Sequence, residues 1–175
     1  MEVGNAYEFP SRFPIPMCEH SDEVLEFWSR VRSETGVEGE LLGAWAFGDS
    51  PGLADELLAL VLKGEKRAAT CLVVEMELRG EPEPRAGTYT IVLDGGGRPR
   101  ALLRTVGIRR TTFDDVDEEH AYWEGEGDRT LESYRREHTK YFKRVGKALG
   151  FEFTEDMAVV LERFELVYPK DDATR

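Results

Sequence analysis

The residue best suited to chemistry is Lys66, which comes two positions after Gly64 in the segment Gly64-Glu65-Lys66. An apolar stretch with helical spacing precedes Gly64, and glycine readily ends a helix in a left-handed conformation. We therefore expect Lys66 at a rigid corner between a helix and a strand. An ammonium fixed there can bind a phosphate or polarise a carbonyl, and a desolvated lysine can act as a base. The alternative is that Lys66 only interacts with the carbonyls at the end of the helix.

Carboxylates separated by glycine follow in the segment Glu124-Gly125-Glu126-Gly127-Asp128, which we interpret as an acidic loop. A carboxylate beside Lys66 would keep the lysine charged or act as a base toward a water or a hydroxyl. Hard oxygen ligands from this loop could alternatively hold a divalent cation, the one cofactor that the sequence leaves open. In the simplest alternative, Asp128 caps the next helix and the glutamates favour its N-terminal dipole. We assign capping to Asp128 and a pocket role to Glu124.

The clearest predicted helix covers residues 130–149, with an apolar stripe that includes Tyr134 and His138. His138 is as consistent with a hydrogen-bonded core residue as with a catalytic one. Arg135, beside the stripe, could pair with a phosphate or with Glu124, or form a structural ion pair. The opposite face is basic and could contact an RNA backbone, although a solvated surface is the commoner explanation. Its residues are Arg136, Lys140, Lys143, Arg144 and Lys147.

Aromatic side chains near these segments could stack on a nucleobase, which is worth about 1–3 kcal/mol per base. The candidates are Trp45, Phe47, Tyr122 and Trp123. Trp123 is preferred because it precedes Glu124, whereas Trp45 and Phe47 are also explained as core residues. A second basic run lies along a predicted strand pair and comprises Arg98, Arg100, Arg104, Arg109 and Arg110.

The elements that must position these residues alternate irregularly between helices and strands. Ser21 can cap a helix over residues 22–33, and Ser50-Pro51 begins a second helix that ends at Gly64. Apolar runs predict strands at 41–47, 69–77, 88–93, 100–110 and 157–168. The last run does not keep strict alternation, which suggests a bulge. This order predicts an α+β fold, and closure of five to six strands into a small barrel would remove exposed edges.

Composition limits the classes of function. The chain has 175 residues and a net charge of −12, which argues against non-specific coating of nucleic acid but permits a local basic site. No apolar run approaches the roughly 20 residues that span a bilayer, so no membrane partner is expected and a cytoplasmic location is predicted. The only two cysteines, Cys18 and Cys71, are far apart and are predicted to be reduced thiols.

Several motifs together resemble the ASCH domain family, a branch of the PUA-like β-barrels. They occur in the family's order across residues 41–168, from Trp45-Ala46-Phe47-Gly48-Asp49 through Gly64-Glu65-Lys66-Arg67 and Phe113-Asp114-Asp115-Val116 to Glu124 and the helix with His138. The resemblance implies a PUA-like barrel with flanking helices. We accordingly predict an N-terminal extension with one helix over residues 1–36, an ASCH domain over 37–169 and a disordered tail over 170–175.

Relatives in this family that hydrolyse acylated cytidine use a lysine, a threonine and a glutamate. The resemblance therefore implies Lys66, Thr70 and Glu124 as catalytic candidates. It implies a substrate-binding set of Trp45, Phe47, Asp49, Arg67, Trp123, Tyr134, Arg135 and His138. The family's threonine usually comes three residues after the lysine, where this chain has Ala69. One residue along a strand moves a side chain to the other face, so Thr70 would need a bulge to serve.

These observations favour a protein that binds RNA or a nucleobase-containing ligand in a cleft lined by lysine and glutamate. Because the threonine is displaced, we favour a ribonuclease-like hydrolase, in which the RNA's own 2′-hydroxyl can be the nucleophile. The phosphate backbone would then contact Arg136, Lys140, Lys143 and Lys147. The alternatives are an amidohydrolase of N4-acylated cytidine and an RNA-binding module without catalysis.

Overall fold

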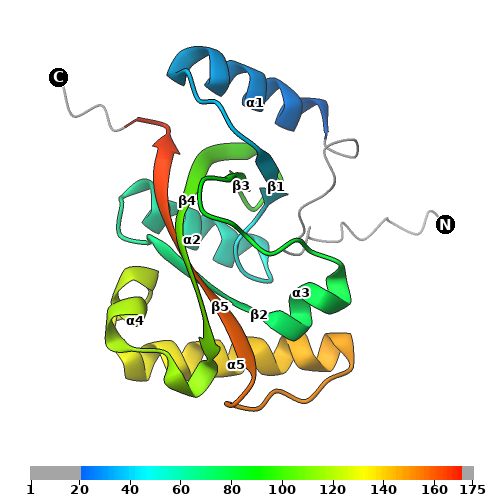
Figure 1. Cartoon of the computed structure of the whole chain (residues 1–175), viewed down its shortest axis with the longest axis vertical. Helices are drawn as coiled ribbons and strands as arrows, with labels where there is room; N and C mark the ends of the chain where they lie inside the picture. Colours follow the sequence, from blue (N-terminus) through cyan, green and yellow to red (C-terminus); the bar gives the residue numbers. More distant parts are fainter. Residues whose placement is uncertain (1–20, 171–175) are drawn as a thin grey trace.

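A computed structural model describes residues 21–170. The predicted extension before residue 21, the cysteine at position 18 and the tail after residue 170 lie outside the described residues. Within them the chain forms a mixed five-stranded sheet and five α-helices, which confirms the α+β prediction (Figure 1). No helix of this described part is long and apolar enough to cross a membrane.

The sheet has the strand order β1-β3-β4-β5-β2. Its members are β1 (Leu41–Trp45), β2 (Ala68–Leu72), β3 (Tyr89–Leu93), β4 (Pro99–Thr112) and β5 (Ala158–Tyr168). β1 runs parallel to β3, and the other neighbours are antiparallel. Along the β4–β5 ladder, β4 has one extra residue between Thr105 and Gly107, and β5 has one extra residue between Leu166 and Tyr168. The imperfect alternation of the last strand therefore does mark a bulge.

The predicted closure into a barrel is not seen, because β1 and β2 are the two edges and no ladder joins them in the described residues. Side chains fill the space between these edges. Leu42 and Trp45 of β1, Cys71 of β2 and the prolines Pro82 and Pro84 line a cavity of about 40 Å³ there. Prolines cannot donate hydrogen bonds to a ladder, so this segment covers the edges without extending the sheet.

The helices are α1 (Asp22–Thr35), α2 (Pro51–Leu62), α3 (Val73–Arg79), α4 (Glu118–Glu124) and α5 (Leu131–Leu149). α1 lies at one end of the molecule and α5 at the other (Figure 1). Ser21 and Ser50 cap α1 and α2 as predicted, each accepting a hydrogen bond from the amide three residues later. These caps explain why the first two helices begin where the sequence indicates.

Two segments differ from the prediction. The strand expected over 69–77 ends at Leu72, and α3 follows, with Gly80 in a left-handed conformation at its end. Glu124 is not in the predicted acidic loop, because Asp117 caps α4 and Glu124 is the last residue of that helix, whereas residues 125–128 do lie in the connection to α5. Thr130, rather than Asp128, caps α5 through the amide of Ser133. Asp128 instead accepts hydrogen bonds from the amide and hydroxyl of Thr130.

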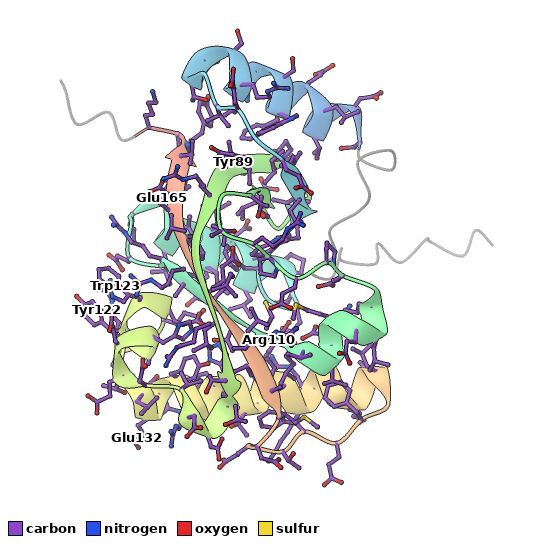
Figure 2. All side chains as sticks on the ribbon, viewed as in Figure 1. Tyr89, Arg110, Tyr122, Trp123, Glu132 and Glu165 are labelled. Carbon is purple, nitrogen blue, oxygen red and sulfur yellow. The ribbon has the colours of Figure 1, made fainter. Side chains whose placement is uncertain are left out.

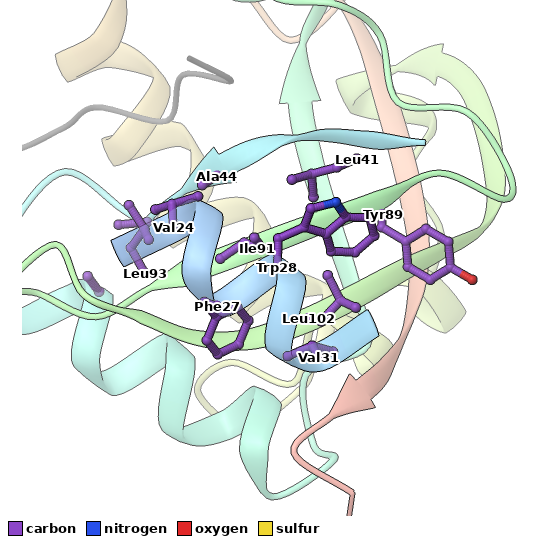
Figure 3. Close-up of a cluster of buried hydrophobic side chains, with 12 residues drawn as sticks. Val24, Phe27, Trp28, Val31, Leu41, Ala44, Tyr89, Ile91, Leu93 and Leu102 are labelled. Carbon is purple, nitrogen blue, oxygen red and sulfur yellow. The ribbon is translucent and has the colours of Figure 1, made fainter. Parts of the chain in front are cut away.

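Apolar side chains gather in three clusters around the sheet. In the first, Val24, Phe27 and Trp28 of α1 pack on Ile91 and Leu102 of the sheet (Figure 3). In the second, α2 packs on β3 and β5. The third lies between α5 and the sheet and contains Phe113, Tyr134, Phe142 and Phe153. This last cluster fixes the helix that faces the candidate site.

Candidate functional site

The Lys66 ammonium is buried between two carboxylates at the base of a pocket. Its Nζ lies 2.5 Å from Glu124 Oε2 and 2.6 Å from Glu126 Oε1, and it donates to the Glu124 carbonyl at 3.2 Å. The side chains of Lys66 and Glu124 are each only 2% exposed. The structure therefore brings together the lysine and the glutamate that the sequence singled out.

Backbone contacts fix the two partners at this distance. Gly64 is left-handed, as predicted, and the Lys66 amide donates to the Leu60 carbonyl at the end of α2. The Arg67 amide donates to the Trp123 carbonyl at 2.8 Å, which ties the end of α4 to the start of β2. Gly125, with φ of 73°, lies so close that a Cβ would be 2.4 Å from the Glu65 carbonyl oxygen. Only glycine permits this approach without displacement of the backbone.

Thr70 also lies in this cluster, without the bulge that the sequence argument required. Its Oγ1 donates to Glu124 Oε1 at 2.7 Å, and the β2–β5 ladder is regular from Ala68 to Leu72. The count of strand faces from Lys66 fails because Lys66 precedes β2, which starts at Ala68. Ala69 points to the opposite face and packs in the second apolar cluster. The displacement of the threonine by one residue is therefore no obstacle to its presence in the site.

His120 also contacts Thr70 and was not singled out from the sequence. Its Nε2 lies 2.9 Å from Thr70 Oγ1 and 3.3 Å from Glu124 Oε1, and the residue is 4% exposed. Tyr134 contributes its hydroxyl at 2.7 Å from Thr70 Oγ1. The spacing of four residues between His120 and Glu124 is a signal that could have found this residue, because it places both on one face of a helix.

His138 faces the same carboxylate from α5. Its Nδ1 lies 3.0 Å from the Tyr134 carbonyl, which can only accept, so Nδ1 carries a proton. Its Nε2 lies 3.5 Å from Glu124 Oε1, and the side chain is 12% exposed. Nε2 is therefore the ring atom that can gain or lose a proton at the pocket.

The pocket above these residues has a volume of about 370 Å³. Its floor includes Lys66, Thr70 and Glu124, and Phe47 forms part of its wall. Charged and aromatic residues that the sequence reasoning did not assign to a pocket also line it: Glu56, Glu126, Glu137, Tyr141 and Arg144. Four carboxylates against one lysine and one arginine make the pocket acidic when His138 is neutral.

Burial and charge act in opposite directions on the central pair. Burial alone would raise the pKa of Glu124, but the Lys66 ammonium, His138 and hydrogen bonds from the two histidines hold this pKa well below its usual range. Burial likewise acts to lower the pKa of Lys66, and Glu124 and Glu126 together raise it instead. Burial and the nearby Glu124 charge raise the pKa of Tyr134 well above its usual value. At neutral pH the site therefore contains a charged pair beside a protonated tyrosine.

The lowered pKa of Glu124 predicts an acid-dependent loss of stability. A carboxyl group with a lower pKa in the folded state stabilises the fold above its unfolded pKa of about 4.3, and this contribution is lost as pH falls through the folded pKa. We expect wild-type stability to fall relative to that of Glu124→Gln as the pH drops below about 4.3. Urea denaturation from pH 7 to pH 3 measures this difference. The exposed change Glu165→Gln is the control. If the difference in free energy of unfolding between wild type and Glu124→Gln did not change with pH any more than it does for this control, the prediction would be contradicted.

Most of the other predicted substrate residues have structural contacts outside the pocket. Trp123 lies 4.6 Å from the Arg163 guanidinium and 6.0 Å from that of Arg67, measured from its ring centroid. Figure 2 shows Trp123 and Tyr122 at the periphery of the molecule beside α4. Trp45 packs edge-on against Phe47, which does line the pocket. Trp123 is therefore not placed to stack on a ligand in this pocket.

The remaining three predicted contacts also have partners. Arg67 Nε donates to the Gly64 carbonyl at 3.0 Å. The Arg135 guanidinium donates to the Asp114 carbonyl at 2.6 Å, so it reaches neither the pocket nor Glu124. Asp49 accepts from Arg144 Nε at 2.8 Å and holds that arginine at the pocket rim. Asp49 thus acts on the pocket through Arg144.

The basic face of α5 carries acidic partners as well. Arg136 and Lys140 both bind Glu137, at 2.8 Å and 3.1 Å. Lys143 and Lys147 are exposed on the same helix. The second basic run is paired in the same way, with Asp94, Glu165, Asp117 and Glu83 as partners. The second run is therefore fully paired, whereas Lys143 and Lys147 on α5 have no ion pair within the described residues, and contact of this face with RNA stays a prediction.

The carboxylates proposed as cation ligands are otherwise engaged. Glu124 and Glu126 both bind the Lys66 ammonium, and Asp128 binds Thr130. Among residues 21–170, no three His, Cys, Asp or Glu side chains are grouped so that they could hold a metal ion. The donor set therefore fits an ammonium rather than a divalent cation.

We compared the sequence and the fold with those of known proteins. The sequence model of the ASCH domain matches residues 43–168, which is most of the chain. The chain belongs to the ASCH family. An ASCH domain from Lactobacillus crispatus JV V101 is 28% identical with a TM-score of 0.78, and the match covers 88% of this chain and 99% of that one. A protein from Enterococcus faecalis V583 with the family model DUF984 is 30% identical with a TM-score of 0.75, and the match covers 86% and 93%. Curated proteins give no match.

Proposed function

We propose that this ASCH protein hydrolyses the amide bond of a small acylated nucleobase, such as an N4-acylated cytidine. The observation that carries the proposal is the convergence of Lys66, Thr70 and Glu124 at the floor of one pocket. These are the residue types that the resemblance implies for this reaction. The pocket volume of about 370 Å³ lies at the lower end of the range of roughly 300–1,000 Å³ for small-molecule sites.

We propose a role for each group from its position in the pocket. The Lys66 ammonium can polarise the acyl carbonyl and stabilise the oxyanion that develops there. The Glu124 carboxylate, kept ionised by that ammonium, can accept the proton of the attacking group. In the imidazolium form of His138, the Nε2 that faces the pocket carries a proton and can donate it to the departing amine. The products would be a carboxylate and the free nucleobase amine.

The charges that line the pocket favour a nucleoside as the substrate. This differs from the sequence analysis, which favoured RNA. Glu56, Glu126 and Glu137 line the pocket, and Glu137 also pairs with Arg136 and Lys140. A phosphate backbone would approach these carboxylates and be repelled. A small uncharged ligand avoids that repulsion.

The test is to incubate the purified protein with N4-acetylcytidine, N4-acetylcytidine 5′-monophosphate and a single-stranded RNA, and to follow products by chromatography. We expect cytidine release, a kcat/KM at least about tenfold lower for the phosphorylated compound, and a loss of about 10²–10⁴-fold in Glu124→Gln. Glu165→Gln, an exposed change of the same type, is the control. Cleavage of RNA that depends on Glu124 would favour a ribonuclease. Binding of the nucleoside without turnover would favour a non-catalytic module.

A further inference from the structure

The hydroxyl of Thr70 has three hydrogen-bonding partners, all of them buried. Oγ1 lies 2.7 Å from Glu124 Oε1, 2.7 Å from the Tyr134 hydroxyl and 2.9 Å from His120 Nε2. A threonine hydroxyl has one proton and two lone pairs. Together with the bond to Cβ, three partners account for all four tetrahedral directions of this oxygen.

The direction of each hydrogen bond follows from the charge on Glu124. Lys66 Nζ, 2.5 Å from Oε2, keeps this carboxylate ionised, and an ionised carboxylate only accepts. The single Thr70 proton must therefore lie toward Glu124, because two oxygens with facing lone pairs would repel at 2.7 Å. Both lone pairs of Oγ1 then accept, one from the Tyr134 hydroxyl and one from a protonated His120 Nε2. A bare Nε2 would present its lone pair to both Thr70 and Glu124.

The surroundings of Tyr134 are consistent with its role as a donor. Its ring is stacked on Phe113 at 5.8 Å and on His138 at 4.0 Å, so the hydroxyl is held in place by packing. Burial and the nearby Glu124 charge raise the pKa of this tyrosine, which keeps its proton on the oxygen. His120 is held in turn by the first turn of α4, where its amide donates to Asp117.

We infer that Thr70 is a positioning residue and that the nucleophile of the proposed hydrolysis is a water molecule activated by Glu124. The inference rests on the proposed function and deepens it. Neither lone pair of Oγ1 is available to attack a carbonyl, and removal of its proton would expose only the direction that faces Glu124. Thr70 and His120 instead fix the orientation of the Glu124 carboxylate.

The resulting reaction balances without a covalent enzyme intermediate. Water oxygen forms a bond to the acyl carbon while its proton passes to Glu124, and the carbonyl electrons collect on an oxyanion beside Lys66. The C–N bond then breaks as the nitrogen takes the Nε2 proton of an imidazolium His138, and the proton on Glu124 passes to that Nε2, 3.5 Å away, which restores the starting state. If Thr70 were the nucleophile, its proton would pass to Glu124 Oε1, toward which it already points, and an acyl group would reside on the threonine oxygen.

The first test is the protonation state of His120, which is read without substrate. The protein labelled with ¹⁵N-histidine is measured by long-range ¹H–¹⁵N correlation at pH 7–8, and the His120 signals are assigned by their loss in His120→Gln. The sequence has three histidines, so the assignment is tractable. A proton on Nε2 supports the inference. A bare Nε2 with the proton on Nδ1 overturns it.

The second test compares Thr70→Val with Glu124→Gln on N4-acetylcytidine. A positioning hydroxyl predicts a loss of about 10–100-fold in kcat for Thr70→Val, whereas loss of a nucleophile predicts about 10⁴-fold or more, down to the Glu124→Gln level or below. His120→Gln, whose amide can still donate to Thr70, should retain more activity than His120→Phe. An acylated protein in the intact mass spectrum of acid-quenched wild type would overturn the inference. Absence of any wild-type turnover would instead contradict the proposed function, and the NMR result would still decide the state of Thr70.

Discussion

The Lys66→Met variant is expected to be less stable than wild type by about 3–5 kcal/mol at pH 7, and to lose its hydrolytic activity. The substitution leaves Glu124 buried and charged, without the ammonium 2.5 Å away that offsets its desolvation. The surviving donors, Thr70 and His120, contact the other carboxylate oxygen. Urea denaturation monitored by tryptophan fluorescence measures the change in free energy of unfolding.

Two further variants separate the buried pair from a general effect of the substitution. Lys140→Met removes a lysine from the exposed pair with Glu137 and is expected to change stability little. The double variant Lys66→Met/Glu124→Gln removes the buried charge as well and should recover part of the lost stability. If Lys66→Met were as stable as Lys140→Met, the buried pair would not be the constraint that we describe.

The Gly125→Ala variant is expected to lose about 3 kcal/mol or more and most of its activity. Part of the loss, about 1–2 kcal/mol, comes from a left-handed conformation that alanine adopts poorly. The remainder comes from overpacking, because the new Cβ would lie 2.4 Å from the Glu65 carbonyl oxygen and 2.8 Å from the backbone nitrogen of Lys66. Relief of this contact must move Glu124 away from Lys66. Thermal unfolding and nucleoside hydrolysis measure the two effects.

Gly150→Ala is the matched control for this variant. Gly150 also ends a helix in a left-handed conformation, with φ of 83°, but a Cβ there would meet no atom within 4 Å. It should therefore show only the conformational cost of about 1–2 kcal/mol and full activity. Equal behaviour of the two variants would show that the close approach at Gly125 has no role.

The elements predicted correctly from the sequence are those with strong local signals. Ser21 and Ser50-Pro51 mark the starts of α1 and α2, and the apolar stripe marks α5. The secondary-structure predictions failed where the intrinsic preference of the residues differed from the structure that their packing or helix caps impose. Val73 and Val74 favour a strand, yet they begin α3, which buries Glu75 and Met76. In α4 the capping signals at Asp117 and Gly125 were present, but the acidic composition suggested a loop.

Prediction of the site was limited because its residues are far apart in the sequence and meet only in the folded protein. Lys66 was singled out by its position after Gly64, and the family resemblance implied Lys66 and Glu124 together, whereas their separation of 58 residues leaves no local pattern that pairs them. Thr70 was assigned to the wrong face because Lys66 precedes β2, so strand alternation cannot be counted from Lys66 to Thr70. Trp123 was favoured for its position beside Glu124, but neighbours on a helix point in different directions. Closure of the barrel could not be decided by alternation alone, since edge and interior strands can share the same pattern.

The position of β2 at the edge of the sheet has a consequence for the order of assembly during synthesis. Thr70 lies on β2, whose strand partner in the described chain is β5, with Ala68 opposite Arg163. At about 5–20 residues per second, the ribosome needs roughly 5–20 s to add the residues between these partners. The nascent chain therefore carries the lysine and threonine of the site for seconds before the strand that anchors them exists. The pocket is among the last parts of the protein to form, so its ligand would bind only chains that have completed the sheet.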